Sequence, residues 1–132
     1  MSPIRRWLKA GAVGLALGLA CKDGTGPVAG TLQLQLTVPP ANVGADGAIK
    51  LVLGGPAPTS VTPAAGLALW SSAFTGTTDT VVVTGTLPAG TVLTLAVTDN
   101  RPSRYSAQIL EVAAGGTFQL RSLSGYALTV VR

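Results

Sequence analysis

Apolar and polar residues alternate along most of the chain after Gly30. Between Leu32 and Val38 every second residue is apolar, and Pro39-Pro40 ends the run. A period of two places the apolar side chains on one face of an extended strand. This stretch is therefore expected to form a half-buried strand whose leucines face a core.

Further segments of this kind follow, separated by turns rich in glycine and proline. Besides the first strand, the pattern predicts strands over residues 49–53, 67–72, 80–86, 91–98, 105–112, 117–120 and 126–131, a turn over 42–47 and a proline-rich connection over 56–63. No amphipathic helix of useful length lies between them. The pattern predicts an all-β fold, a single antiparallel β-sandwich of about 7–9 short strands.

Residues 105–114 also fit a second interpretation. Tyr105, Ile109 and Val112 are spaced so that they share one face of a helix. However, Gly115-Gly116 ends the run after ten residues. We therefore favour a strand over a helix for this segment.

The first 21 residues have a different pattern. Arg5, Arg6 and Lys9 precede an uncharged run rich in alanine, glycine and leucine, which ends at Cys21, the only cysteine of the chain. The run is about half of the roughly 20 apolar residues that a membrane-spanning helix needs. A basic, then apolar, then small-residue order is typical of a secretory signal. We expect a signal helix that is not part of the folded domain.

Residues 1–21 resemble the signal of bacterial lipoproteins, which ends in a lipobox. Small Ala20 precedes Cys21, and Gly18 stands where the pattern usually has leucine. The resemblance implies cleavage between Ala20 and Cys21 and lipidation of the Cys21 sulfur. Two or three acyl chains on one residue are enough for stable membrane anchoring. A simple cleaved signal followed by a chance cysteine is the alternative.

These features predict three segments in the chain. Residues 1–20 form the lipoprotein signal peptide, 21–30 hold the lipidated cysteine and a flexible tether, and 31–132 form the β-sandwich domain. Lys22 follows the cysteine, where an aspartate favours retention in the inner membrane of some bacteria. The resemblance therefore implies a lipid-anchored protein of the cell envelope, with the outer membrane preferred if the organism has one.

The sandwich region also resembles a known family. Segments 47–51, 61–66 and 90–95 resemble cohesin-type sandwich modules of bacterial surface proteins. This resemblance implies the fold class, and fold does not fix function.

Composition excludes several function classes. The formal net charge is +4, but three of the nine basic residues lie in the signal, which leaves six against five acidic residues. The remaining chain is near neutral, so no nucleic-acid partner is expected. The chain has no histidine, so a Ser-His catalytic triad is impossible. We expect no enzyme activity, no cofactor and no metal.

Candidate surface contacts are few. Arg101 and Arg104 bracket a short loop and are candidates for holding a phosphate or an acidic sugar, although a solvated loop is favoured. Asp46, Asp79 and Asp99 are expected in loops, where their oxygens suit calcium or simple turn formation equally well.

Aromatic residues offer a further candidate site. Trp70, Tyr105 and Tyr126 fit either a glycan-binding platform or core packing, and core packing is favoured because aromatics are scarce. Trp70 remains a candidate contact.

Together these observations predict an envelope lipoprotein with a binding or structural module. Its partners are the membrane, through the lipid on Cys21, and an envelope protein or glycan. An enzyme of unfamiliar type, or a chaperone-like assembly factor with an open sheet edge, is the alternative.

Overall fold

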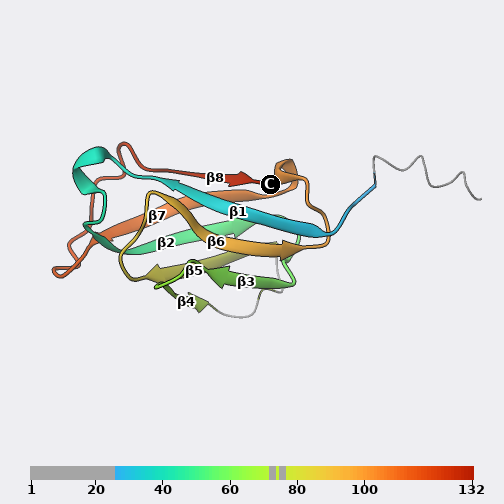
Figure 1. Ribbon diagram of the computed structural model, residues 1–132, viewed down its shortest axis with the longest axis horizontal. Coiled ribbons are helices and arrows are strands. Elements are labelled where there is room, and N and C mark those ends of the chain that lie inside the picture. The colour runs from blue at the N-terminus through green and yellow to red at the C-terminus, as the bar shows by residue number, and fades with distance from the viewer. Residues whose placement is uncertain (1–25, 72–73, 75–76) are drawn as a thin grey trace, which may run out of the picture.

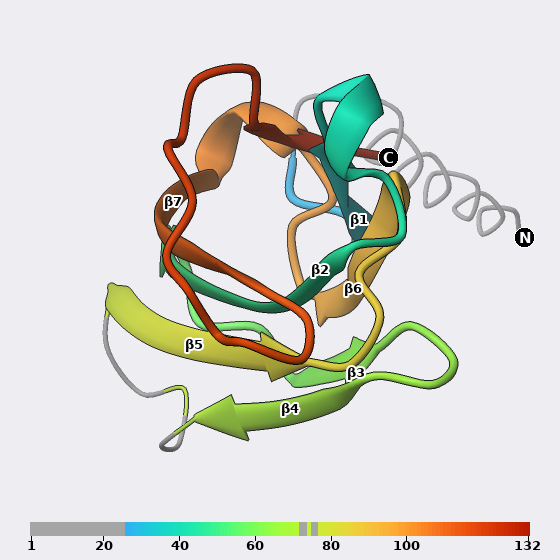
Figure 2. The ribbon, with the colours of Figure 1, turned by 90° about the vertical axis from the view of Figure 1, so that its left-hand side faces the viewer.

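The chain folds into a two-layer β-sandwich, as expected from the sequence. The computed structural model describes residues 26–71, 74 and 77–132, which contain eight strands in two four-stranded antiparallel sheets (Figure 1, Figure 2). The first sheet contains β1 (Gly30–Thr37), β3 (Ser60–Pro63), β6 (Gly90–Val97) and β8 (Ala127–Val131). The second sheet contains β2 (Asp46–Gly54), β4 (Ala68–Ser71), β5 (Thr78–Thr84) and β7 (Ser106–Ala114).

The strand order is that of a rolled-up hairpin. The sheets have the orders β3-β6-β1-β8 and β4-β5-β2-β7. The pairs β1–β8, β2–β7, β3–β6 and β4–β5 are those of one long hairpin with its tip between β4 and β5. The pairs β1–β6 and β2–β5 join the rolled arms. Among the eight described strands, β4 and β5 are the only two that are consecutive in the chain and paired with each other.

The core lies between the two sheets and is aliphatic. Leu32, Leu34 and Leu36 of β1 are buried, and the polar residues between them are not, so the predicted alternation is confirmed. The buried hydrophobic residues are Leu32, Leu34, Leu36, Val38, Ile49, Leu51, Leu53, Val81, Val83, Leu87, Val92, Leu93, Leu95, Val97 and Val112. Tyr105 and Tyr126 are partly buried against this cluster.

One irregularity increases the share of β6 that is buried. Val92 and Leu93 are neighbours in the chain, and both are fully buried. The pairing of β1 with β6 shifts between Leu34 and Gln35, so Val92 has no partner opposite it. A bulge of this kind places one extra residue in a strand and redirects its side chain.

The sandwich has two distinct ends (Figure 1). We call the end at which β1 begins the near end. There Gly30 pairs with Val97, and Gly54 pairs with Ser106. At the far end Thr37 pairs with Ala127, and Asp46 pairs with Ala114. The C-terminus lies at the near end, as does the start of the described chain.

Three sequence-based predictions of secondary structure are corrected. Residues 60–63 form β3 inside the expected proline-rich connection; Pro63 is tolerated because β3 is an edge strand. Residues 117–120 are not a strand, because Phe118 has a left-handed φ of 57° and only Leu120 makes a single bridge, to Ala113. The strand expected over 80–86 covers Thr78–Thr84, and Gly85 follows it with φ 125°.

The remaining elements match the expected pattern. The ambiguous segment 105–114 is a strand, β7. Two short 3₁₀ turns, η2 (Pro40–Asn42) and η3 (Pro102–Arg104), lie in the connections that the sequence marked as turn and loop. In the part of the chain that the structure describes, no helix is long and apolar enough to cross a membrane.

Candidate functional site

The three candidate aromatic residues do not form one platform. Trp70 is 62% exposed on β4, so core packing is wrong for this residue. Tyr105 lies beside Ser106 at the near end, whereas Tyr126 reaches Asp46 at the far end. The eight residue steps of β2 that separate these ends span about 27 Å. Tyr105 and Tyr126 pack against the core, as the favoured alternative predicted.

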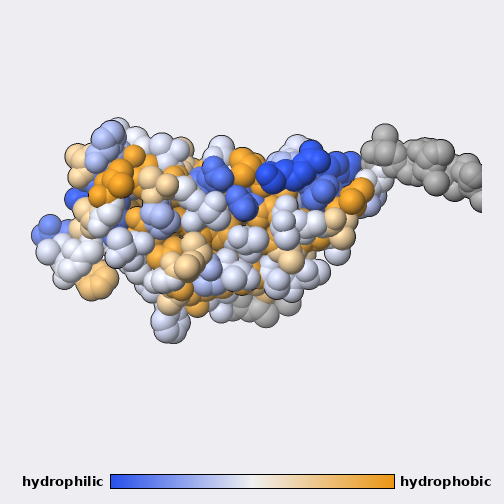
Figure 3. All heavy atoms as spheres, in the orientation of Figure 1, coloured by the Kyte–Doolittle hydropathy of each residue, from blue (hydrophilic) through white to orange (hydrophobic). Residues whose placement is uncertain are grey.

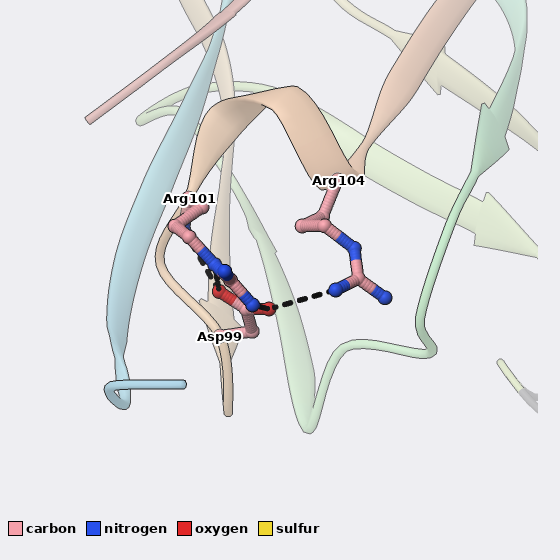
Figure 4. A network of polar contacts seen from close by, with 3 residues as sticks. All are labelled: Asp99, Arg101 and Arg104. Carbon is pink, nitrogen blue, oxygen red and sulfur yellow. Dashed lines mark hydrogen bonds and ion pairs between the residues drawn. The ribbon is translucent and has the colours of Figure 1, made fainter. Parts of the chain in front are cut away.

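Arg101 and Arg104 both face a buried carboxylate at the near end (Figure 4). Arg101 donates from Nε to Asp99 Oδ1 at 2.9 Å and from a terminal nitrogen to Oδ2 at 2.7 Å. A terminal nitrogen of Arg104 lies 3.7 Å from the same Oδ2. Asp99 is only 6% exposed. It lies in the loop after β6, two residues beyond the end of that strand.

This arrangement fixes the charge state of Asp99. Hydrogen bonding from the Arg101 side chain outweighs the effect of burial and lowers the pKa of Asp99 from 3.8 to about 2. The same contact raises the pKa of Arg101. An external phosphate would have to compete with a carboxylate that is ionised at neutral pH. In Figure 3 a band of strongly hydrophilic residues runs toward this end of the molecule.

A second buried carboxylate lies at the far end. Asp46 begins β2 and is 2% exposed, whereas the sequence placed it in a loop. Its Oδ1 accepts from Arg121 Nε at 2.8 Å, and its Oδ2 accepts from the Tyr126 hydroxyl at 2.5 Å. Asn42 donates to that hydroxyl at 3.0 Å. Burial and the bond to Asp46 raise the pKa of Tyr126.

This network ties the two sheets together at the far end. Tyr126 directly precedes β8 in the first sheet, whereas Asp46 belongs to β2 in the second. Arg121 comes from the connection between β7 and β8. Paired and hydrogen-bonded in this way, a buried carboxylate positions chain segments.

The outward surface of the second sheet is hollowed beside this network. One hollow of about 380 Å³ has glycines as half of its lining residues, including Gly47, Gly85 and Gly115, with Thr84 and Phe118 beside them. A smaller hollow of about 140 Å³ lies between Val82 and Leu120, over Ala48 and Ala113. Ala48 pairs with both Thr84 and Ala113, so the two hollows adjoin. We call this combined surface the outer groove.

Large apolar side chains border the outer groove. Phe118 and Leu120, on the β7 side, are each 66% exposed. Trp70, on the β4 side, donates from its indole nitrogen to Thr84 Oγ1 at 3.1 Å. The sequence interpretation missed Phe118 and Leu120, because it placed them in a strand. The pair Gly115-Gly116 just before them was the available signal for a loop.

The three candidate carboxylates do not lie together, so they cannot all hold one metal ion. Asp99 and Asp79 lie at the near end, where Asp79 pairs with Leu53, whereas Asp46 lies at the far end. Asp79 lies in β5 and not in the expected loop. Over residues 26–71, 74 and 77–132, no three acidic, cysteine or histidine side chains are grouped so that they could hold a metal. The expected lipidation site, Cys21 with Ala20 before it, lies outside the described residues.

Comparisons of the chain with protein-family models, with curated proteins and with solved structures found no match.

Proposed function

We propose that this chain is a lipid-anchored protein of the cell envelope whose β-sandwich is a binding module. The observation that carries the proposal is the separation of its two ends. The described chain enters β1 at the near end (Figure 1). The residues that line the larger hollow, among them Asp46 and Gly115, lie at the far end. A domain anchored in this way presents the groove away from the lipid surface.

The short connection to Cys21 supports this orientation. The carbonyl of Val28 accepts a hydrogen bond of 2.8 Å from the backbone nitrogen of Asn100, so the chain is attached to the domain two residues before β1. Seven residue steps separate Val28 from Cys21, a reach of about 24 Å at most. The lipid on Cys21 would therefore keep the near end close to the membrane.

A binding role agrees better with the described side chains than an enzymatic role. Asp46 and Asp99, the two buried carboxylates, are each engaged by arginine. The lowered pKa of Asp99 makes it a poor proton acceptor at neutral pH.

A chaperone role through an open sheet edge has less support. Three of the four edge strands are short, since β3 and β4 have four residues each and β8 has five, whereas β7 has nine. The end of β7 is covered by the segment around Leu120, where Arg121 donates to the Val112 carbonyl at 2.8 Å. Short and covered edges offer little template for strand addition.

Replacement of the cysteine tests the anchor. Cys21→Ser should abolish labelling with radioactive palmitate and release the protein from the membrane fraction, because the thioether needs the sulfur. Lys22→Ala is the matched control and should remain membrane-bound. Cys21→Ser protein that still fractionates wholly with membranes would show that the anchor assignment is wrong.

A further inference from the structure

We propose that the outer groove binds a neutral oligosaccharide, with Trp70 and Phe118 stacking on the faces of its sugar rings. This inference rests on the proposed function, because it names the ligand class of that binding module. The outer groove combines a hollow of suitable size, two presented aromatic rings and a surface nearly free of net charge.

The floor of the groove consists of glycines and alanines, which have no side chains large enough to fill it. Gly47 and Gly115 approach each other so closely that a Cβ on Gly47 would lie 2.9 Å from the Gly115 Cα. Ala48 and Ala113 continue this floor of small residues toward Leu120. The larger hollow, about 380 Å³, is within the range of small-ligand sites.

The two residues that carry the aromatic rings are each held by a hydrogen bond, although the rings are exposed. The indole nitrogen of Trp70 is held by Thr84, itself a lining residue of the larger hollow. The backbone nitrogen of Phe118 donates to the Ala114 carbonyl at 3.0 Å, which holds this left-handed residue at the rim. Exposed large apolar side chains that border a hollow typically mark an interaction site.

The two aromatic rings come from opposite sides of the larger hollow. Trp70 lies on β4 and is bonded to Thr84, at the end of β5. Phe118 comes from the loop after β7 and lines the hollow together with Thr84. A ligand that stacks on both rings must therefore reach across the hollow, which favours an oligosaccharide over a single sugar.

The charges of the groove favour a neutral ligand. Asp46 lines the larger hollow, but Arg121 and Tyr126 already engage its carboxylate. The smaller hollow has Lys50 and Glu111, which carry opposite charges and pair across β2 and β7. Such side chains and the hydroxyls of Thr84 and Thr86 are able to hydrogen-bond sugar hydroxyls.

A peptide is a poorer occupant of this surface. The groove lies on the face of the sheet, where β2 is paired along its length with β5 on one side and β7 on the other. Peptides that add to sheets gain affinity from unpaired main-chain groups at an edge. A sugar ring needs only aromatic faces and polar side chains, because its CH groups are apolar and its hydroxyls bond outward.

Trp70 provides a direct measurement of binding. The chain has two tryptophans, Trp7 and Trp70. Cleavage before Cys21 would remove Trp7, and Trp7→Phe makes Trp70 the only indole in any uncleaved chain as well. The probes are cellotetraose and the tetrasaccharide of β-1,4-linked N-acetylglucosamine. We expect at least one of them to shift Trp70 emission to shorter wavelength, saturably, at millimolar concentration or below.

Calorimetry on variants of the full chain locates the site. Trp70→Ala and Phe118→Ala should each weaken binding by about tenfold or more, equivalent to about 1.4 kcal/mol. Val28→Ala, which shortens an exposed apolar side chain at the near end, is the matched control and should leave affinity unchanged. Thermal melts establish that each variant is folded.

Two results would overturn the proposal. One is the absence of saturable binding by either tetrasaccharide to the folded chain, including the case in which an apolar peptide shifts the emission instead. The other is a Trp70→Ala variant that binds as tightly as its parent. Either result leaves membrane fractionation of the Cys21→Ser variant unaffected, so failure of the glycan site and failure of the anchor are distinguishable.

Discussion

Two tyrosines at opposite ends of this sandwich have different hydrogen-bonding environments. The Tyr126 hydroxyl donates to Asp46 and accepts from Asn42. The Tyr105 hydroxyl is buried and has no hydrogen-bond partner of ordinary geometry among the described residues. Burial and, secondarily, the charge of Asp99 raise the pKa of Tyr105. The two residues therefore form a matched pair for testing what a buried hydroxyl contributes.

Removal of the two hydroxyls should have unequal effects. Tyr126→Phe leaves the buried Asp46 carboxylate without one of its two partners, which should cost about 1–3 kcal/mol. For a domain of this size that corresponds to a decrease in Tm of several degrees. Tyr105→Phe removes a buried hydroxyl whose contact with the Asp99 backbone lacks ordinary hydrogen-bond geometry, so its Tm should stay equal or increase. Equal decreases in calorimetric melts would contradict the assigned contacts.

The other residue-scale prediction concerns acid. The folded-state pKa of Asp99 is about 2, below its ordinary value of 3.8. The ionised carboxylate therefore stabilises the folded state, fully at neutral pH, and this contribution is lost as the pH falls from about 4 through 2. Asp99→Asn should lower the Tm most near pH 7, with a difference from wild type that shrinks toward pH 2.

Melting curves of both proteins at several pH values test this assignment. Glu111→Gln, which removes a charge from an exposed position, is the control and should change the Tm little. A Tm difference for Asp99→Asn that is the same at pH 2 and pH 7 would show that ionisation of Asp99 beside Arg101 does not stabilise the folded state.

Individual strands were the most predictable level of this structure. β1 follows from its alternation alone, because one-face burial requires a period of two. β3 was not predictable, because its four residues have only one paired neighbour and end at Pro63. The segment 117–120 was misassigned because its β-type residues follow two glycines and Phe118 adopts a left-handed conformation. Local composition does not report which extended segments find a partner.

A pair of substitutions in β1 tests this alternation. Leu34 is fully buried, whereas Gln35 is only partly buried and its amide lies 3.4 Å from Gln33 Oε1. Leu34→Asp buries an unpaired carboxylate at a cost of several kcal/mol, out of about 5–15 kcal/mol for a whole domain. It should unfold the protein or lower its Tm by many degrees.

Gln35→Asp serves as the control in the same thermal melts. It should change the free energy of unfolding by only about 0.5 kcal/mol, because it lies on the solvent side. Similar Tm decreases from both substitutions would mean that β1 is buried on both faces.

At the scale of the whole molecule, the sequence predicted the sandwich class but not the strand order. Pairing partners such as Gln33 and Val131 lie far apart in the chain, and no local pattern records their contact. The outer groove was unpredictable for the same reason. Its rims, Trp70 and Phe118, come from segments that only the sheet order brings to one surface. Arg101 and Arg104 were identified as a pair, but their shared partner Asp99 was expected to form a turn.

The rolled-up hairpin also constrains how the protein is made. β1 pairs only with β6 and β8, so the first strand to be synthesised waits for nearly the whole chain before its ladders form. Only β4 and β5 can pair soon after they are made. Topologies dominated by distant pairings fold slowly, because the entropy of closing long loops is lost before the contacts form. A chain that ends before β8 therefore leaves one side of β1 without the strand that it pairs with in the complete sandwich.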